Sequence, residues 1–77
     1  MRIDLHGYHI HTAWGHFNQR ITHAYHEGYK TCEVITGQGA MMREFPSWAN
    51  NHPRVKSYTQ KPHNPGSFFV KLNKKPK

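Results

Sequence analysis

The sequence Lys-Thr-Cys-Glu-Val-Ile at residues 30–35 is followed at once by Thr-Gly-Gln-Gly at residues 36–39. The first part is short and contains β-branched residues, which is typical of a strand. The second part has little steric bulk, and apolar residues recur at helical spacing directly after it, from about Met41 to Asn50. The stretch therefore predicts a strand, a glycine-rich loop and a helix in succession.

The residues before this stretch predict a further strand. Residues 2–6 alternate between apolar and polar side chains, which is the pattern of a strand with one buried face. Ile3 and Leu5 would face the core, whereas Asp4 and His6 would lie on the exposed face. We therefore expect the polar pair to be accessible to a ligand.

A long helix is expected between these two strands. Apolar residues fall at helical spacing from Ile10 onward, and Gly28 suits a left-handed C-terminal cap. In the second helical stretch, Pro46 predicts a kinked or two-piece helix, because proline removes a hydrogen bond and clashes with the preceding turn. Trp14 and Trp48 are expected to occupy core positions of the two helices rather than to stack on bases.

Two further strands are expected at the C-terminal side, over residues 55–60 and 67–73, with a loop over residues 61–66. The order βαβαββ requires parallel pairing of the first two strands through a right-handed crossover. The predicted fold class is α/β (α+β), a two-layer sandwich in which two helices cover one face of a mixed four-stranded sheet. The other face is open, and Phe69 and Lys71 would lie on it.

The length and composition limit the function. The chain has 77 residues, enough for one domain but not for a Rossmann domain, a TIM barrel or a two-domain enzyme. We expect one domain over residues 1–73 and a frayed basic tail over residues 74–77. Cys32 is the sole cysteine, so no intramolecular disulfide is possible, and no apolar run is long enough to span a membrane. A cytoplasmic location is expected; the sequence leaves the oligomeric state open, and a monomer is assumed.

The charge indicates the kind of partner. Lys and Arg number 11 against 4 Asp and Glu, giving a formal charge of +7. Such an excess favours a polyanion, because each phosphate neutralised releases condensed counterions. A basic surface that serves only solubility is the alternative.

The glycine-rich loop is a candidate phosphate site. Thr36, Gly37, Gln38 and Gly39 lie between a predicted strand and a predicted helix, where free backbone N–H groups meet the positive helix end. No Gly-Lys-Ser/Thr follows, so the loop is not a Walker A motif. A nucleic-acid phosphate fits better than a nucleotide cofactor, and Arg43 could supply a counter-charge. A plain turn is the alternative.

Asp4 and His6 are the candidate catalytic pair. A carboxylate beside an imidazole can hold its tautomer and make it a general acid or base near neutral pH. RNA would be the easier substrate, because its 2′-OH is an internal nucleophile and no metal is required. DNA nicking would need an activated water, with Mg²⁺ as the expected cofactor. Of the four acids only Asp4 and Glu33 could share a site, which is few for a two-metal nuclease.

Several histidines could suggest a metal site: His6, His9, His11, His23 and His26. Their spacing does not match a standard zinc pattern. An exposed polar helix face is the preferred interpretation, and adventitious nickel or copper binding is the alternative.

Taken together, these motifs resemble the Smr (small MutS-related) domain. The resemblance rests on Ile-Asp-Leu-His-Gly at 3–7, Thr-Gly-Gln-Gly at 36–39, Arg-Glu-Phe-Pro-Ser-Trp at 43–48, His-Pro-Arg-Val at 52–55, and the glycine-containing loop and strand at 64–72. It covers nearly the whole chain. It implies a βαβαββ sandwich like the C-terminal domain of translation initiation factor three.

The resemblance also implies nucleic-acid binding and, in many members, RNA cleavage or DNA nicking. The family's Asp-x-His motif is tied to cleavage and corresponds to Asp4 and His6. Its glycine loop is tied to substrate binding and corresponds to Thr36 through Gly39. The leading hypothesis is an Smr-type endonuclease acting on structured or ribosome-associated RNA, or nicking DNA, with Arg43 and Lys71 as further phosphate contacts.

Two alternatives remain open at this point. One is a module that binds structured or branched nucleic acid without cutting it. The other is an adaptor whose open sheet face docks a protein. A steep salt dependence of binding would favour nucleic acid over the adaptor.

Overall fold

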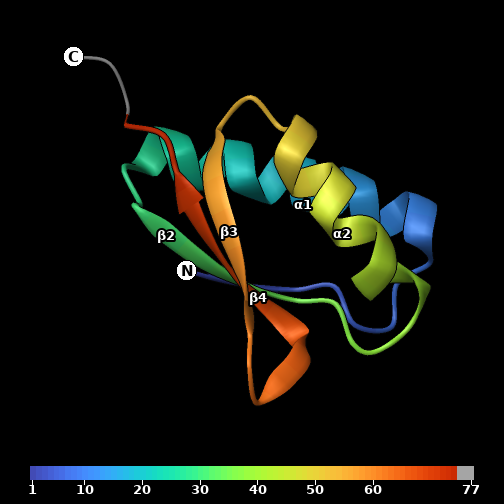
Figure 1. Cartoon of the computed structure of the whole chain (residues 1–77). Helices are drawn as coiled ribbons and strands as arrows, with labels where there is room; N and C mark the ends of the chain where they lie inside the picture. The colour runs from blue at the N-terminus through green and yellow to red at the C-terminus, as the bar shows by residue number, and fades with distance from the viewer. Residues whose placement is uncertain (75–77) are drawn as a thin grey trace.

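The computed structural model of the chain describes residues 1–74 and contains the predicted elements in the predicted order (Figure 1). They are β1 (Arg2–Asp4), α1 (Ile10–Glu27), β2 (Thr31–Ile35), α2 (Ala40–Asn51), β3 (Val55–Lys61) and β4 (Asn64–Leu72). No helix in this described part is long and apolar enough to cross a membrane. Residues 75–77 of the expected basic tail lie outside the described residues, so its fraying stays a prediction.

The four strands form one mixed sheet in the order β1-β2-β4-β3. β1 pairs with β2 in parallel, with Ile3 opposite Val34, whereas β4 runs antiparallel to both β2 and β3. The parallel pairing of the first two strands is thereby confirmed. Because parallel neighbours end at the same edge of a sheet, the segments that follow β1 and β2 leave it side by side (Figure 1).

Both helices cover one face of the sheet, and the core lies between the two layers (Figure 1). Phe45 of α2 occupies its middle, with its ring centroid 4.4 Å from that of Phe68 in β4 and 5.1 Å from that of Phe17 in α1. Further fully buried apolar side chains are Ile3, Leu5, Ala13, Ile21, Ala24, Cys32, Val34, Ala49 and Val70. The opposite sheet face is open as expected, and Phe69 is 48% exposed there.

The hairpin between β3 and β4 is tighter than the sequence suggests. The prediction of a loop over residues 61–66 is wrong. β4 begins at Asn64 and pairs there with Lys61, so only Pro62 and His63 remain in the turn. Turn-forming residues indicate that the chain reverses but not where pairing resumes. An irregularity in the pairing next to the turn allows these residues to remain in the sheet.

The second helix is continuous through Pro46, so the expected two-piece helix does not form. Phe45 immediately before the proline and Ala49 one turn after it are both buried against the core. Packing on both sides of Pro46 therefore keeps the helix on the sheet despite the missing hydrogen bond.

Trp14 does not occupy the core position that its spacing suggested. It is 40% exposed, whereas its neighbour Ala13 is fully buried. The Trp14 ring lies 5.6 Å from that of Trp48, which is partly buried at the edge of the core. At this point α1 therefore contributes the small side chain of Ala13 to the core. The two tryptophans pack against each other at the edge of the core.

His52, directly after α2, is a buried titratable side chain. It is 4% exposed, its ring packs edge-on against Phe17, and its Nδ1 accepts a hydrogen bond from the Arg54 N–H at 3.0 Å. Burial lowers the pKa of His52 below its ordinary value, and the Arg54 charge adds to this, while the Asn18 backbone carbonyl acts in the opposite direction. No hydrogen bond in the described structure satisfies Nε2. The folded state therefore favours the neutral ring.

We expect the free energy of unfolding to decrease as the pH falls below about 6.5, the ordinary histidine pKa. Below that pH the unfolded chain binds a proton that folded His52 resists, which costs at most about 1.4 kcal/mol per pH unit. Denaturant unfolding of wild type and His52→Asn between about pH 5 and 8 measures the effect. The asparagine oxygen can still accept the Arg54 N–H but does not titrate, so an equal pH dependence in both proteins would contradict this assignment.

Candidate functional site

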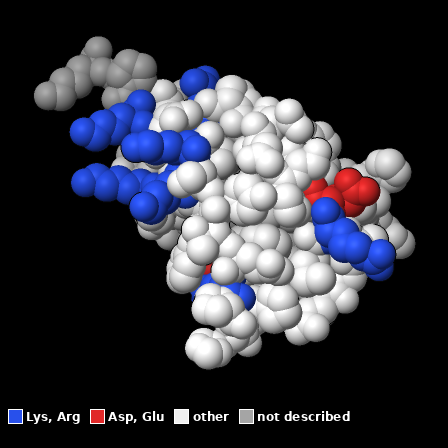
Figure 2. All heavy atoms as spheres, viewed as in Figure 1, with Lys and Arg blue, Asp and Glu red and all other residues white. Residues whose placement is uncertain are grey.

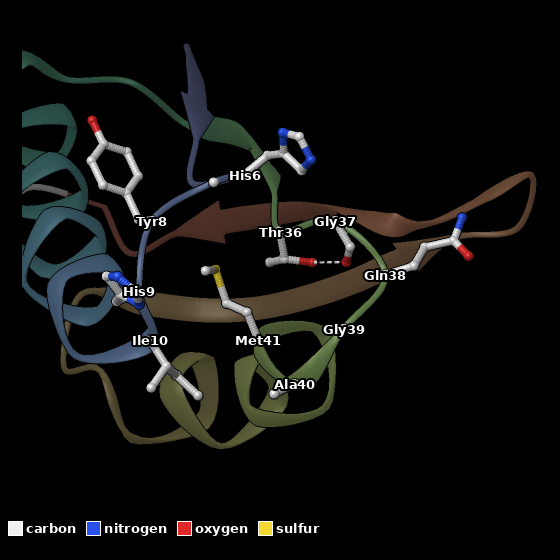
Figure 3. A pocket seen from close by; sticks show the side chains of 11 residues that line it. His6, Tyr8, His9, Ile10, Thr36, Gly37, Gln38, Gly39, Ala40 and Met41 are labelled. Atoms are coloured by element: carbon white, nitrogen blue, oxygen red, sulfur yellow. Dashed lines mark hydrogen bonds between the residues drawn. The ribbon is translucent and has the colours of Figure 1, made fainter.

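The carboxyl ends of β1 and β2 open into a hollow of about 400 Å³. One wall is the segment between β1 and α1, which contributes His6 and Tyr8, and the other is the loop between β2 and α2, residues 36–39. Figure 3 shows Met41, from the first turn of α2, between these two walls. The two motifs singled out from the sequence, some thirty residues apart, thus meet at one site.

His6 lies against Gly37. Gly37 has a φ of 76°, a left-handed conformation that favours glycine, and a Cβ built there would stand 3.0 Å from Cδ2 of His6. A side chain at this position would push the imidazole away, so glycine permits the ring to rest beside the loop. An imidazole at the rim of a hollow can exchange a proton with a group bound inside it.

Asp4 supports the backbone next to His6. Its Oδ1 accepts a hydrogen bond from the His6 N–H at 3.0 Å. The sequence predicts this carboxylate beside the imidazole, but the hydrogen bond goes to the backbone instead. The reason is that β1 ends at Asp4 and the chain turns, so the two residues do not stand side by side on one strand. The carboxylate stabilises the turn that presents the histidine.

Gly66 of β4 holds the glycine-rich loop in place. Its carbonyl accepts hydrogen bonds from the N–H groups of Thr36 at 2.7 Å and Gly37 at 3.1 Å. The Thr36 hydroxyl lies 3.1 Å from the same carbonyl and 2.9 Å from the Gly37 carbonyl, the second contact being drawn in Figure 3. Sequence patterns did not reveal this role. The one available signal was a glycine within a strand, which often marks the close approach of another backbone.

Both helices begin at the hollow, and neither beginning is capped by a side chain. His9 is the N-cap of α1 and Gly39 that of α2, and neither makes a side-chain capping bond. The first turns contain no acidic residue. Because both N-caps line the hollow, free N–H groups and the positive ends of two helix dipoles lie at its wall. This arrangement suits an anion such as a phosphate.

This combination of fold and loops can be compared with known proteins. The Smr domain family model matches residues 3–72. The chain belongs to the Smr domain family. No curated protein sequence matches it.

Solved structures that are similar to this Smr domain include the following two. The Smr domain of Thermus thermophilus MutS2 is 22% identical with a TM-score of 0.87, over 94% of this chain and 96% of that one. YdaL, a stand-alone small MutS-related protein from Escherichia coli, is 21% identical with a TM-score of 0.80, over 95% of this chain and 64% of YdaL. At these identities the likeness concerns the fold, and it confirms the predicted sandwich.

Neither of the two predicted basic residues lines the hollow of this Smr domain. Arg43 is exposed in the first turn of α2, one turn after Gly39, and does not line the hollow, whereas Gln38 does. Lys71 lies five residues beyond Gly66 along β4, where it lines a different depression. Any contact of Lys71 with nucleic acid would therefore be made at a separate surface.

Glu33 does not join Asp4 in a shared acidic site. Lys61 donates a hydrogen bond to the Glu33 carboxylate, Ser67 Oγ donates to it at 3.2 Å, and Arg2 Nε lies 3.7 Å away. The Lys61 hydrogen bond is the main reason that the pKa of Glu33 lies below its ordinary value. Among residues 1–74, no group of three histidine, cysteine or acidic side chains is placed to hold a metal ion.

Proposed function

We propose that this Smr domain is a nucleic-acid endonuclease that cleaves RNA, or nicks DNA, at the hollow between the two loops. The contact of His6 with Gly37 carries the proposal, because it puts an imidazole at the rim of a site formed by two helix N-termini. Membership of the Smr family and the net charge of +7 support a nucleic-acid partner. The proposed substrates include structured and ribosome-associated RNA, and the proposed location is the cytoplasm.

On RNA, the N–H groups of the helix N-termini and those loop N–H groups that do not donate to Gly66 bind the phosphate next to the reacting ribose. His6 takes the proton of the 2′-OH, and the 2′-oxygen forms a bond to phosphorus. The bond from phosphorus to the 5′-oxygen breaks, and that oxygen leaves with a proton from solvent. The products are a 2′,3′-cyclic phosphate and a 5′-OH end. No metal takes part in these steps.

DNA lacks the 2′-OH, so nicking needs water as the nucleophile. Mg²⁺ could activate such a water, but the side chains present fit this ion poorly. Asp4 and His6 also line a shallower hollow beside the first, together with Gly7 and Tyr8, and Asp4 is the sole acidic residue that lines either one. Mg²⁺ sites rely on oxygen ligands, usually with one or two carboxylates. We therefore give the RNA reaction priority and assign no step to a metal.

The proposal is tested by incubating the purified chain with labelled structured RNA and with supercoiled DNA, each in EDTA and in Mg²⁺. We expect RNA cleavage in EDTA, with products that carry a 2′,3′-cyclic phosphate and a 5′-OH. Cleavage that leaves a 5′-phosphate, or that requires Mg²⁺, would contradict the mechanism through the 2′-OH.

A non-catalytic nucleic-acid-binding module is the second candidate. The hydrogen bond of Asp4 favours it, because the carboxylate contacts the His6 backbone and not the ring that would act as base. In that case the chain would bind RNA with a steep salt dependence and leave both substrates intact under all four conditions.

The same hydrogen bond predicts how two Asp4 variants differ. Asp4→Asn keeps an oxygen that can accept the His6 N–H, whereas Asp4→Ala removes it. If Asp4 acts by holding the turn, Asp4→Asn should cleave RNA within about threefold of wild type, and Asp4→Ala should lose tenfold or more, roughly the worth of one charge-assisted hydrogen bond. Single-turnover cleavage measures both. Equal losses in the two variants would show that the negative charge itself is required.

A further inference from the structure

A basic surface lies at the other end of the sheet from His6. It is a depression of about 570 Å³, and four of the chain's seven lysines line it: Lys30, Lys56, Lys71 and Lys74. Figure 2 shows Lys and Arg side chains gathered at this end, close to where the described chain ends in Figure 1. None of the four acidic residues lines it. We call these four lysines the lysine surface.

The fold, rather than the sequence, brings the four lysines together. Lys30 immediately precedes β2, and Lys71 lies opposite Thr31 in the adjacent β4. Lys56 falls at a register shift in β3, between the paired residues Val55 and Ser57, so it is an extra residue outside the regular ladder. Such bulges commonly redirect a side chain. With Lys74 following β4, lysines within β3 and β4 and beside β2 and β4 line one depression that has no acidic residue.

Two aromatic side chains line the depression. Tyr25 and Tyr29 both line it, but Tyr25 is buried and the Arg54 guanidinium lies over its ring, 4.5 Å from the centroid. Tyr29 is 47% exposed, while its backbone N–H is anchored to the Ala24 carbonyl at 3.0 Å. An accessible ring on a fixed backbone, surrounded by lysines, suits unpaired nucleotides, whose bases stack on aromatics while cations bind their phosphates.

The lysine surface lies within reach of a nucleic acid bound at the His6 hollow. Gly66 contacts the glycine-rich loop at one end of β4 and Lys71 lies five residues further on, a span of roughly 17 Å at about 3.4 Å per residue. At the roughly 3.4 Å per phosphate of a stacked helical strand, this span corresponds to at most about five nucleotides, and an extended unpaired strand covers it with fewer. A nucleic acid bound at the hollow can therefore reach the lysine surface with a short extension.

We propose that the lysine surface binds an unpaired extension of the nucleic acid that occupies the His6 hollow, with a base on Tyr29 and phosphates among the lysines. The inference rests on the proposed function, since it concerns a second segment of the same substrate. It makes the substrate class more specific: a structured element flanked by a short stretch of unpaired nucleotides. The lysine surface with the exposed Tyr29 ring is better suited to a single strand than to a duplex, because stacked and paired duplex bases cannot reach an aromatic ring.

The test measures binding and not cleavage. Wild type is titrated with a 2′-O-methyl RNA hairpin, which has no nucleophile, and with the same hairpin carrying an unpaired extension of about ten nucleotides on either end. We expect one extension to tighten binding about fivefold or more. Lys30→Gln/Lys56→Gln should abolish most of this gain and make the salt slope shallower by about 1.4. Tyr29→Ala should reduce affinity about fivefold for the extended hairpin only.

A charge-matched variant distinguishes an effect of the lysine surface from the general effect of losing two positive charges. Arg2→Gln/Arg20→Gln removes the same charge from two exposed arginines that do not line the depression, so the gain from the extension should persist. The proposal is overturned if wild type shows no gain, or if both double variants lose it equally. It is also overturned if Lys30 and Lys56 instead control binding to phosphatidylserine vesicles and not to the extended hairpin. Cleavage of the hairpin with natural 2′-OH groups and no extension reports separately on the proposed function.

Discussion

A His6→Ala variant is expected to cleave RNA at least about 10²-fold more slowly than wild type. The imidazole beside Gly37 can take up the 2′-OH proton, and the methyl group of alanine cannot replace it. RNA binding should change little, because the phosphate contacts assigned here are made by backbone N–H groups. Single-turnover cleavage and equilibrium binding on the same RNA separate the two effects.

The control for this variant is His23→Ala. His23 is an exposed histidine in the last turns of α1 and does not line the hollow. It should cleave like wild type, and a difference between the two variants rules out a contaminating nuclease as the source of activity. If His6→Ala also cleaves like wild type, the acid–base role of His6 is wrong. If no protein cleaves while all bind RNA, the binding module replaces the enzyme.

Local patterns predicted the parts of this fold that depend on neighbouring residues. The helical spacing from Ile10 and the glycine at 28 predicted α1 to the residue, and Gly28 has the expected left-handed φ of 87°. The buried Ile3 and Leu5 likewise follow from alternation. Trp14 shows where this reasoning fails: Trp14 and the neighbouring Ala13 fit the apolar face almost equally well, and in the structure Ala13 is the one that is buried.

The site depended on contacts between distant segments, so only part of it could be predicted. The Asp-x-His pair and the glycine-rich loop were recognised, but nothing in either motif reveals that Gly66 binds the loop. Lys71 was predicted as a contact on the open face, yet a side chain's place along a strand depends on register, which composition does not provide. Asp4 was paired with the wrong part of His6 because a strand was assumed to continue through the turn.

The approach of Gly66 to the glycine-rich loop predicts the largest loss of stability. In Gly66→Ala the new Cβ would stand 2.8 Å from the carbonyl carbon of Gly37 and 2.9 Å from its oxygen. Both are backbone atoms, so β4 and the loop must move apart, which weakens the hydrogen bonds that the Gly66 carbonyl accepts. We expect the free energy of unfolding to fall by about 3 kcal/mol. For a domain of this size, that corresponds to a Tm lower by roughly 15 °C.

Gly15→Ala is the matched control, because it makes the same chemical change where there is room. Gly15 lies inside α1, and a Cβ there meets nothing within 4 Å. Alanine should stabilise this helix by about 1 kcal/mol, so the two variants are expected to shift Tm in opposite directions. The displacement of the loop in Gly66→Ala should also move Gly37 away from His6. The variant should therefore cleave RNA more slowly than wild type even at temperatures at which it is folded. If Gly66→Ala instead unfolds like wild type, β4 does not approach the loop this closely, and the contact that places His6 loses its support.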